Sequence, residues 1–263
     1  RIPPPESAMT MTPPQPLDPP HVTLMGPGPS DVPSSVRRAM SAPTLGHLDP
    51  RFLALMDEVA DMLRELMGTQ NRCTMPISAT GSAGMETCLV NLLEPGDRAI
   101  IGVNGVFGSR MCEVATRAGA EVIRVEAPWG RGLDPTAFTR AAEGKGAKVV
   151  ALVHAETSTG VLQDLSGFRE VADRLGAMLV VDAVTSLGGL PVDADAHGID
   201  ALYSGTQKCL SCPPGLSPVS FSDRAVELVT GRKTPVQSWY LDITQLTRYW
   251  GGERAYHHTA PIN

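Results

Sequence analysis

Hydrophobic residues between positions 50 and 67 recur at intervals of three and four, which is the spacing of one face of an α-helix. Asp49 suits the position before this segment, because its side chain can cap the first turn of a helix. Pro50 suits the first helical position, where no amide donor is needed. Gly68 then closes the segment, as glycine commonly does. The pattern predicts a helix between Asp49 and Gly68.

A second pattern follows, in which short apolar runs alternate with helical stretches. The runs in AKVVALVH and AMLVVD are apolar throughout, which indicates strands buried on both faces of a sheet. This order of elements predicts an α/β fold with a mostly parallel central sheet and helices on both faces. Strands are predicted at 98–103, 121–125, 149–153, 178–181 and 201–203, and helices at 84–93, 107–118, 134–142 and 166–175.

The beginning of the chain differs from the rest because proline dominates it. Proline has no amide donor and holds the backbone extended, so residues 1–20 are predicted to be a disordered tail. Residues 21–263 are predicted to form one large domain. The chain has 263 residues, 42% of them hydrophobic, which is enough for a sizeable buried core.

Charge and cysteine content narrow the class of protein. The formal net charge is −6 and no basic stripe is visible, so nucleic acid is not an expected partner. No run of about 18 apolar residues occurs, so no membrane span is expected. The five cysteines are an odd count in a chain of this size and do not form a disulfide scaffold. A reducing, cytoplasmic location is therefore expected.

Ligands of open α/β sheets bind beyond the carboxyl ends of the strands, so the residues that follow each predicted strand are candidates for chemistry. The first such segment is TGSAG at 80–84, between an apolar run and a helix. Its small residues let backbone amides approach a ligand, and a helix N-terminus suits a phosphate. A tight turn without a ligand explains the same residues. The segment matches neither the dinucleotide-binding nor the P-loop pattern.

Asp182 is the second candidate, because it is a carboxylate at the end of an apolar run. Burial raises the pKa of a carboxyl group unless a cation, such as a protonated heterocyclic nitrogen, keeps it charged. An aspartate that caps the turn at Thr185 and Ser186 explains this position equally well.

Lys208 is the third candidate, because it follows the predicted strand at 201–203 amid small residues. A lysine that forms a Schiff base needs a desolvated site that favours its neutral amine. The other lysines, at 145, 148 and 233, lie in polar surroundings, so Lys208 alone fits this requirement.

Cysteine and histidine pairs do not predict a metal site. Cys209 and Cys212 form a CxxC, but no second CxxC exists and prolines follow at once, so two packing residues are expected. His257 and His258 are adjacent, so on a helix or strand they point in different directions. No metal is expected.

These segments together resemble class V, fold-type I aminotransferases, which depend on pyridoxal phosphate, and in particular those of the alanine–glyoxylate and serine–pyruvate type. The resemblance extends over essentially everything after the tail, and the motifs occur in the family's order. The matching stretches are GPGPSDVP (26–33), TGSAGMET (80–87), NGVFG (104–108), HAETSTGV (154–161), VVDAVTSLGG (180–189), YSGTQKCLSCPPG (203–215), KTPVQSWYLD (233–242) and YHHTAP (256–261).

The resemblance implies a role for each matching residue. Lys208 is expected to form the Schiff base with the cofactor and then to act as acid and base for the proton shift. Asp182 is expected to keep the pyridine nitrogen protonated. Phe107, a tryptophan in some relatives, is expected to stack on the ring, with Val184 on the opposite face and Thr157 near the ring oxygen. The expected phosphate cradle comprises Thr80, Gly81, Ser82 (a histidine in some relatives) and Gln207.

In this family, Tyr256 and Thr259 reach the phosphate of the neighbouring subunit, so the resemblance implies a homodimer with composite active sites. Relatives continue past the equivalent of Asn263 into a small C-terminal domain, which carries an arginine that grips the substrate carboxylate. Residues 21–263 are accordingly expected to be the pyridoxal-phosphate-binding large domain, with the small domain missing. Such a fragment is expected to bind the cofactor and to turn over amino acids poorly.

The expected reaction is transamination from L-alanine or L-serine to glyoxylate or another small 2-oxo acid. Three alternatives stay open: an (S)-ureidoglycine–glyoxylate aminotransferase, a fold-type I lyase or desulfurase, and a non-catalytic domain that binds pyridoxal phosphate or serves as a scaffold. A desulfurase needs a mobile catalytic cysteine, and no cysteine is convincingly placed for that role. The presence of both Asp182 and Lys208 argues against the non-catalytic alternative.

Overall fold

A computed structural model describes residues 15–258. The helices of this part are α1 (Ser34–Met40), α2 (Pro50–Met67), α3 (Gly81–Leu92), α4 (Val106–Arg117), α5 (Pro135–Ala141), α6 (Phe168–Leu175), α7 (Asp223–Thr230) and α8 (Ile243–Trp250). The strands are β1 (Cys73–Ile77), β2 (Arg98–Val103), β3 (Glu121–Glu126), β4 (Val149–Val153), β5 (Ala155–Glu156), β6 (Val161–Leu162), β7 (Met178–Asp182), β8 (Ala201–Tyr203) and β9 (Ser217–Phe221).

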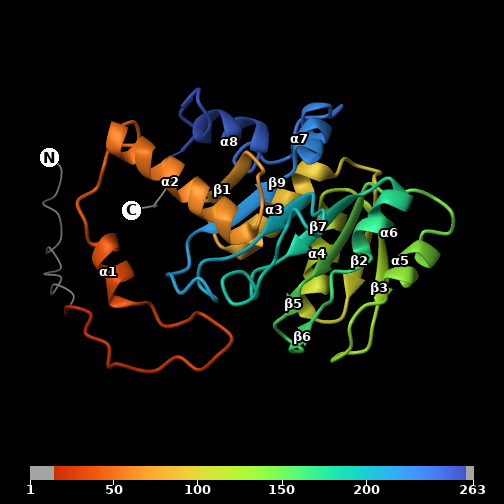
Figure 1. Ribbon diagram of the computed structural model, residues 1–263, viewed down its shortest axis with the longest axis horizontal. Coiled ribbons are helices and arrows are strands. Elements are labelled where there is room, and N and C mark those ends of the chain that lie inside the picture. Colours follow the sequence, from red (N-terminus) through yellow and green to blue (C-terminus); the bar gives the residue numbers. More distant parts are fainter. Residues whose placement is uncertain (1–14, 259–263) are drawn as a thin grey trace, which may run out of the picture.

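Seven strands form the central sheet in the order β1-β9-β8-β7-β4-β2-β3 (Figure 1). The five strands from β8 to β3 are parallel to one another, as predicted. β9 runs antiparallel to both β8 and β1 and extends the sheet at one edge. Neither β1, at the edge of the sheet, nor β9, between β1 and β8, was among the predicted strands. Each contains a proline, and Pro76 and Pro218 are register partners, whereas proline is rare inside sheets.

Helices cover both faces of the sheet, so the predicted fold class is confirmed (Figure 1). Along β4, the side chains of Val149, Ala151 and Val153 enter one core, and those of Val150 and Leu152 enter the other. The first core also contains residues of α2, α3, α4, α7 and α8, whereas the second contains residues of α5 and α6. A strand buried in this way needs apolar residues at every position, which explains the continuous apolar runs.

The predicted helix ends agree well with the structure where local capping sets them. The side chain of Asp49 accepts a hydrogen bond from the Arg51 amide at the start of α2, and Gly68 ends the helix with a φ of 62°. α3 begins at Gly81, three residues before its predicted start. Of the predicted tail, residues 15–20 are exposed and lie in neither helix nor strand, and residues 1–14 lie outside the described part. The segment with α1 extends beyond the body of the sheet (Figure 1).

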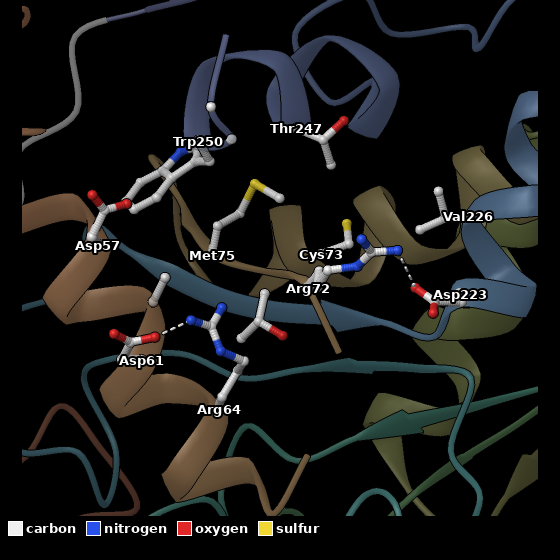
Figure 2. Close-up of a pocket in the computed structure, with 14 residues that line it drawn as sticks. Asp57, Asp61, Arg64, Arg72, Cys73, Met75, Asp223, Val226, Thr247 and Trp250 are labelled. Carbon is white, nitrogen blue, oxygen red and sulfur yellow. Dashed lines mark hydrogen bonds and ion pairs between the residues drawn. The ribbon is translucent and has the colours of Figure 1, made fainter. Parts of the chain in front are cut away.

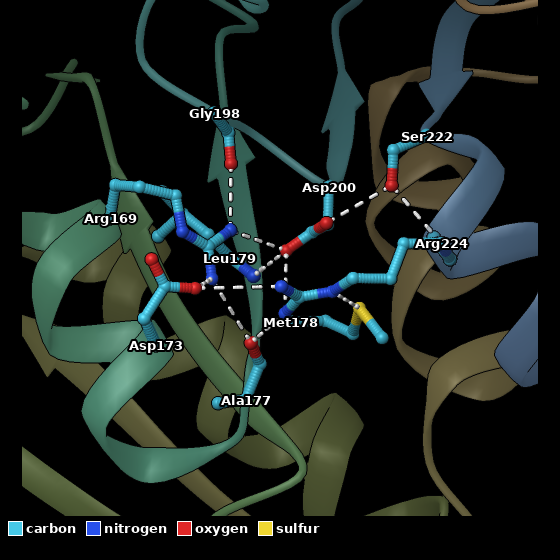
Figure 3. A network of polar contacts seen from close by, with 10 residues as sticks. Arg169, Asp173, Ala177, Met178, Leu179, Gly198, Asp200, Ser222 and Arg224 are labelled. Carbon is cyan, nitrogen blue, oxygen red and sulfur yellow. Dashed lines mark hydrogen bonds and ion pairs between the residues drawn. The ribbon is translucent and has the colours of Figure 1, made fainter.

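A polar network joins the elements at the amino ends of the strands (Figure 3). Asp200, directly before β8, is 4% exposed. Its carboxylate accepts hydrogen bonds from Arg169 Nη1 at 2.8 Å, from the Leu179 amide at 2.8 Å and from Ser222 Oγ at 3.0 Å. Arg224 Nη2 lies 3.4 Å from the same carboxylate. The network ties α6, β7 and α7 together.

Candidate functional site

A cavity of about 200 Å³ lies at the carboxyl ends of β7 and β8, beside the start of α3 and of α4. This is the edge of an α/β sheet at which ligands bind. It brings together most of the residues that the sequence singled out. The lining residues are Thr80, Gly81, Ser82, Met85, Phe107, Arg110, Asp182, Val184, Tyr203, Gln207 and Lys208.

Asp182 is the last residue of β7 and is 2% exposed. Its Oδ1 accepts a hydrogen bond from the Val184 amide at 2.8 Å, and its Oδ2 accepts one from the hydroxyl of Tyr203 at 2.7 Å. Within residues 15–258 it forms no ion pair. Burial raises the pKa of this carboxyl to about 6, although the two hydrogen bonds act in the opposite direction. The bond from Val184 means that Asp182 binds the start of the turn that follows β7, as the capping alternative expects.

Tyr203 is a residue that the sequence reasoning missed at this site. It is the register partner of Asp182 on the neighbouring strand β8, and it is fully buried. Desolvation and the adjacent carboxylate both raise the pKa of its phenol well above the usual value, so the phenol stays a hydrogen-bond donor. The register of two strands puts these side chains together, and sequence spacing does not encode register.

Lys208 lies in the turn that follows β8, which ends at Tyr203. The chain bends away from the sheet after Tyr203, and this bend brings the half-buried lysine into the cavity. Lys208 Nζ donates a hydrogen bond to the carbonyl oxygen of Pro27 at 2.7 Å. Gly28 has a φ of +123°, and a Cβ there would lie 2.5 Å from Lys208 Cδ. Glycine is therefore required for the 26–30 segment to pack over the lysine.

The start of α3 provides backbone donors at the opposite side of the cavity. The preceding residue, Thr80, makes no side-chain cap, so the first-turn amides have no side-chain partner at that position. Gly81 allows a close approach, because a Cβ there would lie 3.1 Å from Val184 Cγ2. Gln207 Oε1 is buried without a hydrogen-bond partner. Uncapped amides suit an anion such as phosphate, and Gln207 also lines the cavity with a side-chain amide whose Nε2 can donate to it, whereas its Oε1 can only accept.

Phe107 and Arg110 come from the first turns of α4. The guanidinium carbon of Arg110 lies 4.8 Å from the centre of the Phe107 ring, and its Nη1 lies 3.4 Å from Ser82 Oγ. Arg110 was not predicted. The available signal was its spacing of three residues from Phe107, which puts both side chains on one face of the helix.

Two of the singled-out residues, Thr157 and Tyr256, do not line this cavity. Thr157 Oγ1 lies 2.5 Å from Thr185 Oγ1, which is a hydrogen bond between two loops beside the cavity. Tyr256 is 57% exposed, and its ring centre lies 4.6 Å from that of His47. Thr259 lies outside the described residues.

The cysteine and histidine pairs differ in part from their predicted behaviour. Cys209 is exposed and Cys212 half-buried, so Cys209 is not the packing residue expected from the CxxC. The rings of His257 and His258 are in contact, with the two Nδ1 atoms 2.6 Å apart, because this segment is neither helix nor strand. Residues 15–258 contain no group of three or more ligating side chains suited to a metal. Over the same range, no helix is long and apolar enough to cross a membrane.

A larger cavity lies elsewhere, between α2, β1, α7 and α8, and has a volume of about 590 Å³ (Figure 2). Its charged residues pair with one another: Arg64 with Asp61, and Arg72 with Asp223 at 3.9 Å. Its floor includes Met75 and other residues of β1. Neither a lysine nor an unpaired buried carboxylate lines it, so the smaller cavity with Asp182 and Lys208 is the candidate site.

Comparisons with known proteins agree with this site. The family model described as aminotransferase class-V matches residues 30–238, and the chain belongs to this family. The chain is 41% identical to an alanine–glyoxylate aminotransferase of Rattus norvegicus, over 99% of this chain and 63% of that protein. It is 39% identical to an (S)-ureidoglycine–glyoxylate transaminase of Bacillus subtilis, over 90% of this chain and 61% of that protein.

A solved structure agrees as well. The alanine–glyoxylate aminotransferase of a Nostoc species superposes with a TM-score of 0.92 and is 49% identical, over 94% of this chain and 66% of that one. The chain thus spans about 63% of the length of the rat relative.

The residues present fit pyridoxal phosphate, the cofactor of this family. Asp182 is a buried carboxylate that lacks a cation among the described residues, and a protonated ring nitrogen would supply one. The uncapped start of α3 suits the phosphate, and the side-chain amide of Gln207, which lines the same cavity, has N–H donors for it. Lys208 lines the same cavity, and its amine could form a Schiff base with the aldehyde carbon of the cofactor.

Proposed function

We propose that the protein is a pyridoxal-phosphate-dependent aminotransferase that moves an amino group from L-alanine or L-serine to glyoxylate or another small 2-oxo acid. The observation that carries the proposal is one cavity with the amine of Lys208 and the buried carboxylate of Asp182. The names of its relatives support the acceptor, since alanine–glyoxylate and ureidoglycine–glyoxylate enzymes are both among them.

Bound pyridoxal phosphate supplies an electron sink for the carbanion that forms when the substrate Cα loses its proton. In this proposal Asp182 holds a proton at the ring nitrogen, where its burial without a cation favours a positive partner. Phe107 and Val184 contact the two ring faces, and Thr157 binds near the ring oxygen. Lys208 Nζ holds the cofactor covalently and then moves the proton at the substrate Cα.

The phosphate is assigned to Thr80, Gly81, Ser82 and Gln207, next to the helix N-terminus. We further infer a homodimer in which Tyr256 and Thr259 of one subunit reach the phosphate of the other, so that each site is composite. The exposure of Tyr256 leaves its ring available for such a contact. Residues 21–263 are taken as the cofactor-binding large domain. The five free cysteines support a reducing, cytoplasmic location.

The first test is the visible absorbance of the purified chain with pyridoxal phosphate, before and after borohydride, beside Lys208→Ala. We expect a visible band that reduction removes, with the cofactor then retained covalently, and neither effect in Lys208→Ala. Lys233→Ala is the matched control, because that lysine lies outside the cavity and should leave the band unchanged. A wild-type chain that stays colourless with added cofactor would overturn the proposal.

A donor panel separates the related activities. L-Alanine or L-serine with glyoxylate should yield pyruvate or hydroxypyruvate together with glycine. Turnover of (S)-ureidoglycine alone would favour the second candidate, which the Bacillus subtilis relative supports. Release of sulfide from cysteine would instead indicate a desulfurase.

Cofactor binding and turnover are measured separately, because the chain spans 63% of the length of the rat relative. Cofactor binding without any amino-group transfer, from any donor, would favour the non-catalytic alternative for this chain. Sedimentation of the protein with bound cofactor tests the homodimer.

A further inference from the structure

Glu156, the second residue of β5, is a buried carboxylate to which the proposed chemistry assigns no role. It is 1% exposed and lies close to the start of α4. Its Oε2 accepts hydrogen bonds from the amides of Phe107 at 3.1 Å and Gly108 at 3.3 Å. Its Oε1 accepts bonds from the amide of Ser158 at 3.2 Å and from Ser158 Oγ at 2.6 Å. It forms no ion pair within the described part of the chain.

These contacts cap α4 from another segment. The residue before the helix is Gly105, which has no side chain to act as a cap. Ser158 Oγ accepts a hydrogen bond from the Val106 amide at 3.0 Å, so residues 156 and 158 together bind the first three amides of the helix. A carboxylate at this end of a helix is also favoured by the helix dipole. Gly105 is needed for the approach, since a Cβ there would lie 2.3 Å from Glu156 Cγ.

The same short segment reaches the other side of the cavity. Thr157, between the two capping residues, bonds Thr185 Oγ1 at 2.5 Å, and Thr185 follows Val184 directly. Residues 156–158 therefore connect the backbone of Phe107 with the side chain of Thr185, the residue next to Val184. Under the proposed function, Phe107 and Val184 are the two residues that contact opposite faces of the cofactor ring.

We propose that Glu156 is a positioning residue that, through residues 156–158, sets the spacing between Phe107 and Val184 and thereby the slot for the planar ring. The proposal rests on the proposed function for the identity of that ring. Its structural part, the capping of α4 by Glu156, stands independently of any cofactor.

The test compares Glu156→Ala and Glu156→Gln with wild type. Glu94→Gln is the matched control, because Glu94 also accepts two amides from a distant segment, those of Lys233 and Thr234, and lies outside the cavity. Two properties are measured: hydrogen exchange of the Phe107 and Gly108 amides without cofactor, and the dissociation constant and visible circular dichroism of bound pyridoxal phosphate.

In Glu156→Ala we expect exchange at these amides to rise about tenfold and cofactor binding to weaken about tenfold, as the loss of charged hydrogen bonds predicts. The dichroic band should shrink as the ring loses its fixed orientation. Glu156→Gln should lie between Glu156→Ala and wild type, because its amide still accepts from α4 but faces the Ser158 amide with a donor. Glu94→Gln should match wild type in both properties.

Wild-type affinity and dichroism in Glu156→Ala, with a wild type that binds cofactor, would overturn the proposal. If wild type itself does not bind, the proposed function fails, and unchanged exchange at Phe107 would then also overturn the capping role. If Glu156→Ala does not fold, Ser158→Ala replaces it, because Ser158 is exposed and carries one of the same caps. It should change both properties in the same direction by a smaller factor, and the absence of any change would overturn the proposal.

Discussion

Asp182 and Asp200 are two buried aspartates, 2% and 4% exposed, at opposite edges of the sheet: Asp182 ends β7, and Asp200 directly precedes the neighbouring strand β8. Asp200 binds Arg169 and also lies near Arg224 (Figure 3). Asp182 accepts hydrogen bonds from Val184 and Tyr203 only, and no cation pairs with it among the described residues. A buried carboxylate with its cations joins parts of the fold, whereas one without them is available to a ligand.

The largest loss of stability is expected when the paired aspartate, Asp200, is replaced. Asp200→Ala leaves the Arg169 guanidinium without its buried partner and the Leu179 amide without an acceptor. We expect the free energy of unfolding to fall by about 3 kcal/mol, as for other broken buried pairs. Urea unfolding at neutral pH measures it. A loss below about 1 kcal/mol would mean that the network contributes no more than an exposed pair.

The unpaired aspartate, Asp182, should instead make the free energy of unfolding depend on pH. Without cofactor, burial raises the pKa of Asp182 from 3.8 to about 6, so the folded state holds this proton more tightly than the unfolded state. The protonated carboxyl of Asp182 therefore contributes about 3 kcal/mol to the free energy of unfolding below about pH 4. This contribution is lost as the pH rises through about 6. Asp182→Asn keeps the shape and removes the charge. Its stability relative to wild type should therefore rise across this interval in urea titrations, and a constant difference would contradict the prediction.

A smaller effect is expected from the hydroxyl that binds Asp182. Tyr203→Phe removes the 2.7 Å hydrogen bond, which should cost about 1 kcal/mol of folding free energy. Because this bond lowers the pKa of Asp182, that pKa should rise further in the variant. Carbon NMR of the Asp182 carboxyl group measures the shift. An unchanged pKa would mean that the phenol does not stabilise the charged form.

The smallest effect on stability is expected from an exposed ion pair, which serves as the reference for the two buried aspartates. Arg117 and Glu113 form an exposed pair on α4 at 2.8 Å, with 79% and 61% of their side chains exposed. Solvent screens such a pair, so Arg117→Ala should change the free energy of unfolding by less than about 0.5 kcal/mol. A loss as large as that of Asp200→Ala would show that burial is not what distinguishes the two cases.

Parts of the fold were predictable because a strand buried on both faces of the sheet has a continuous run of apolar residues. The predicted bounds 98–103, 149–153 and 201–203 agree with β2, β4 and β8. β1 and β9 are also buried at every position, but they were missed because a proline and polar residues such as Thr74, Ser217 and Ser220 interrupt their apolar pattern. At the site, motifs identified Asp182 and Lys208, which line the same cavity. Tyr203, Arg110 and Glu156 were not identified, since each acts through a neighbour distant in the chain or on the next helical turn.

The sequence alone determined the α/β class and the residue types that follow the strands, because continuous apolar runs require a sheet covered on both sides. Only the tertiary structure decided which of the two buried aspartates lacks a cation. Arg169 and Arg224 reach Asp200 from α6 and α7, whereas β7 and β8 bring only a phenol to Asp182. Such partners come from separate helices and from strand register, neither of which a local pattern of residues specifies.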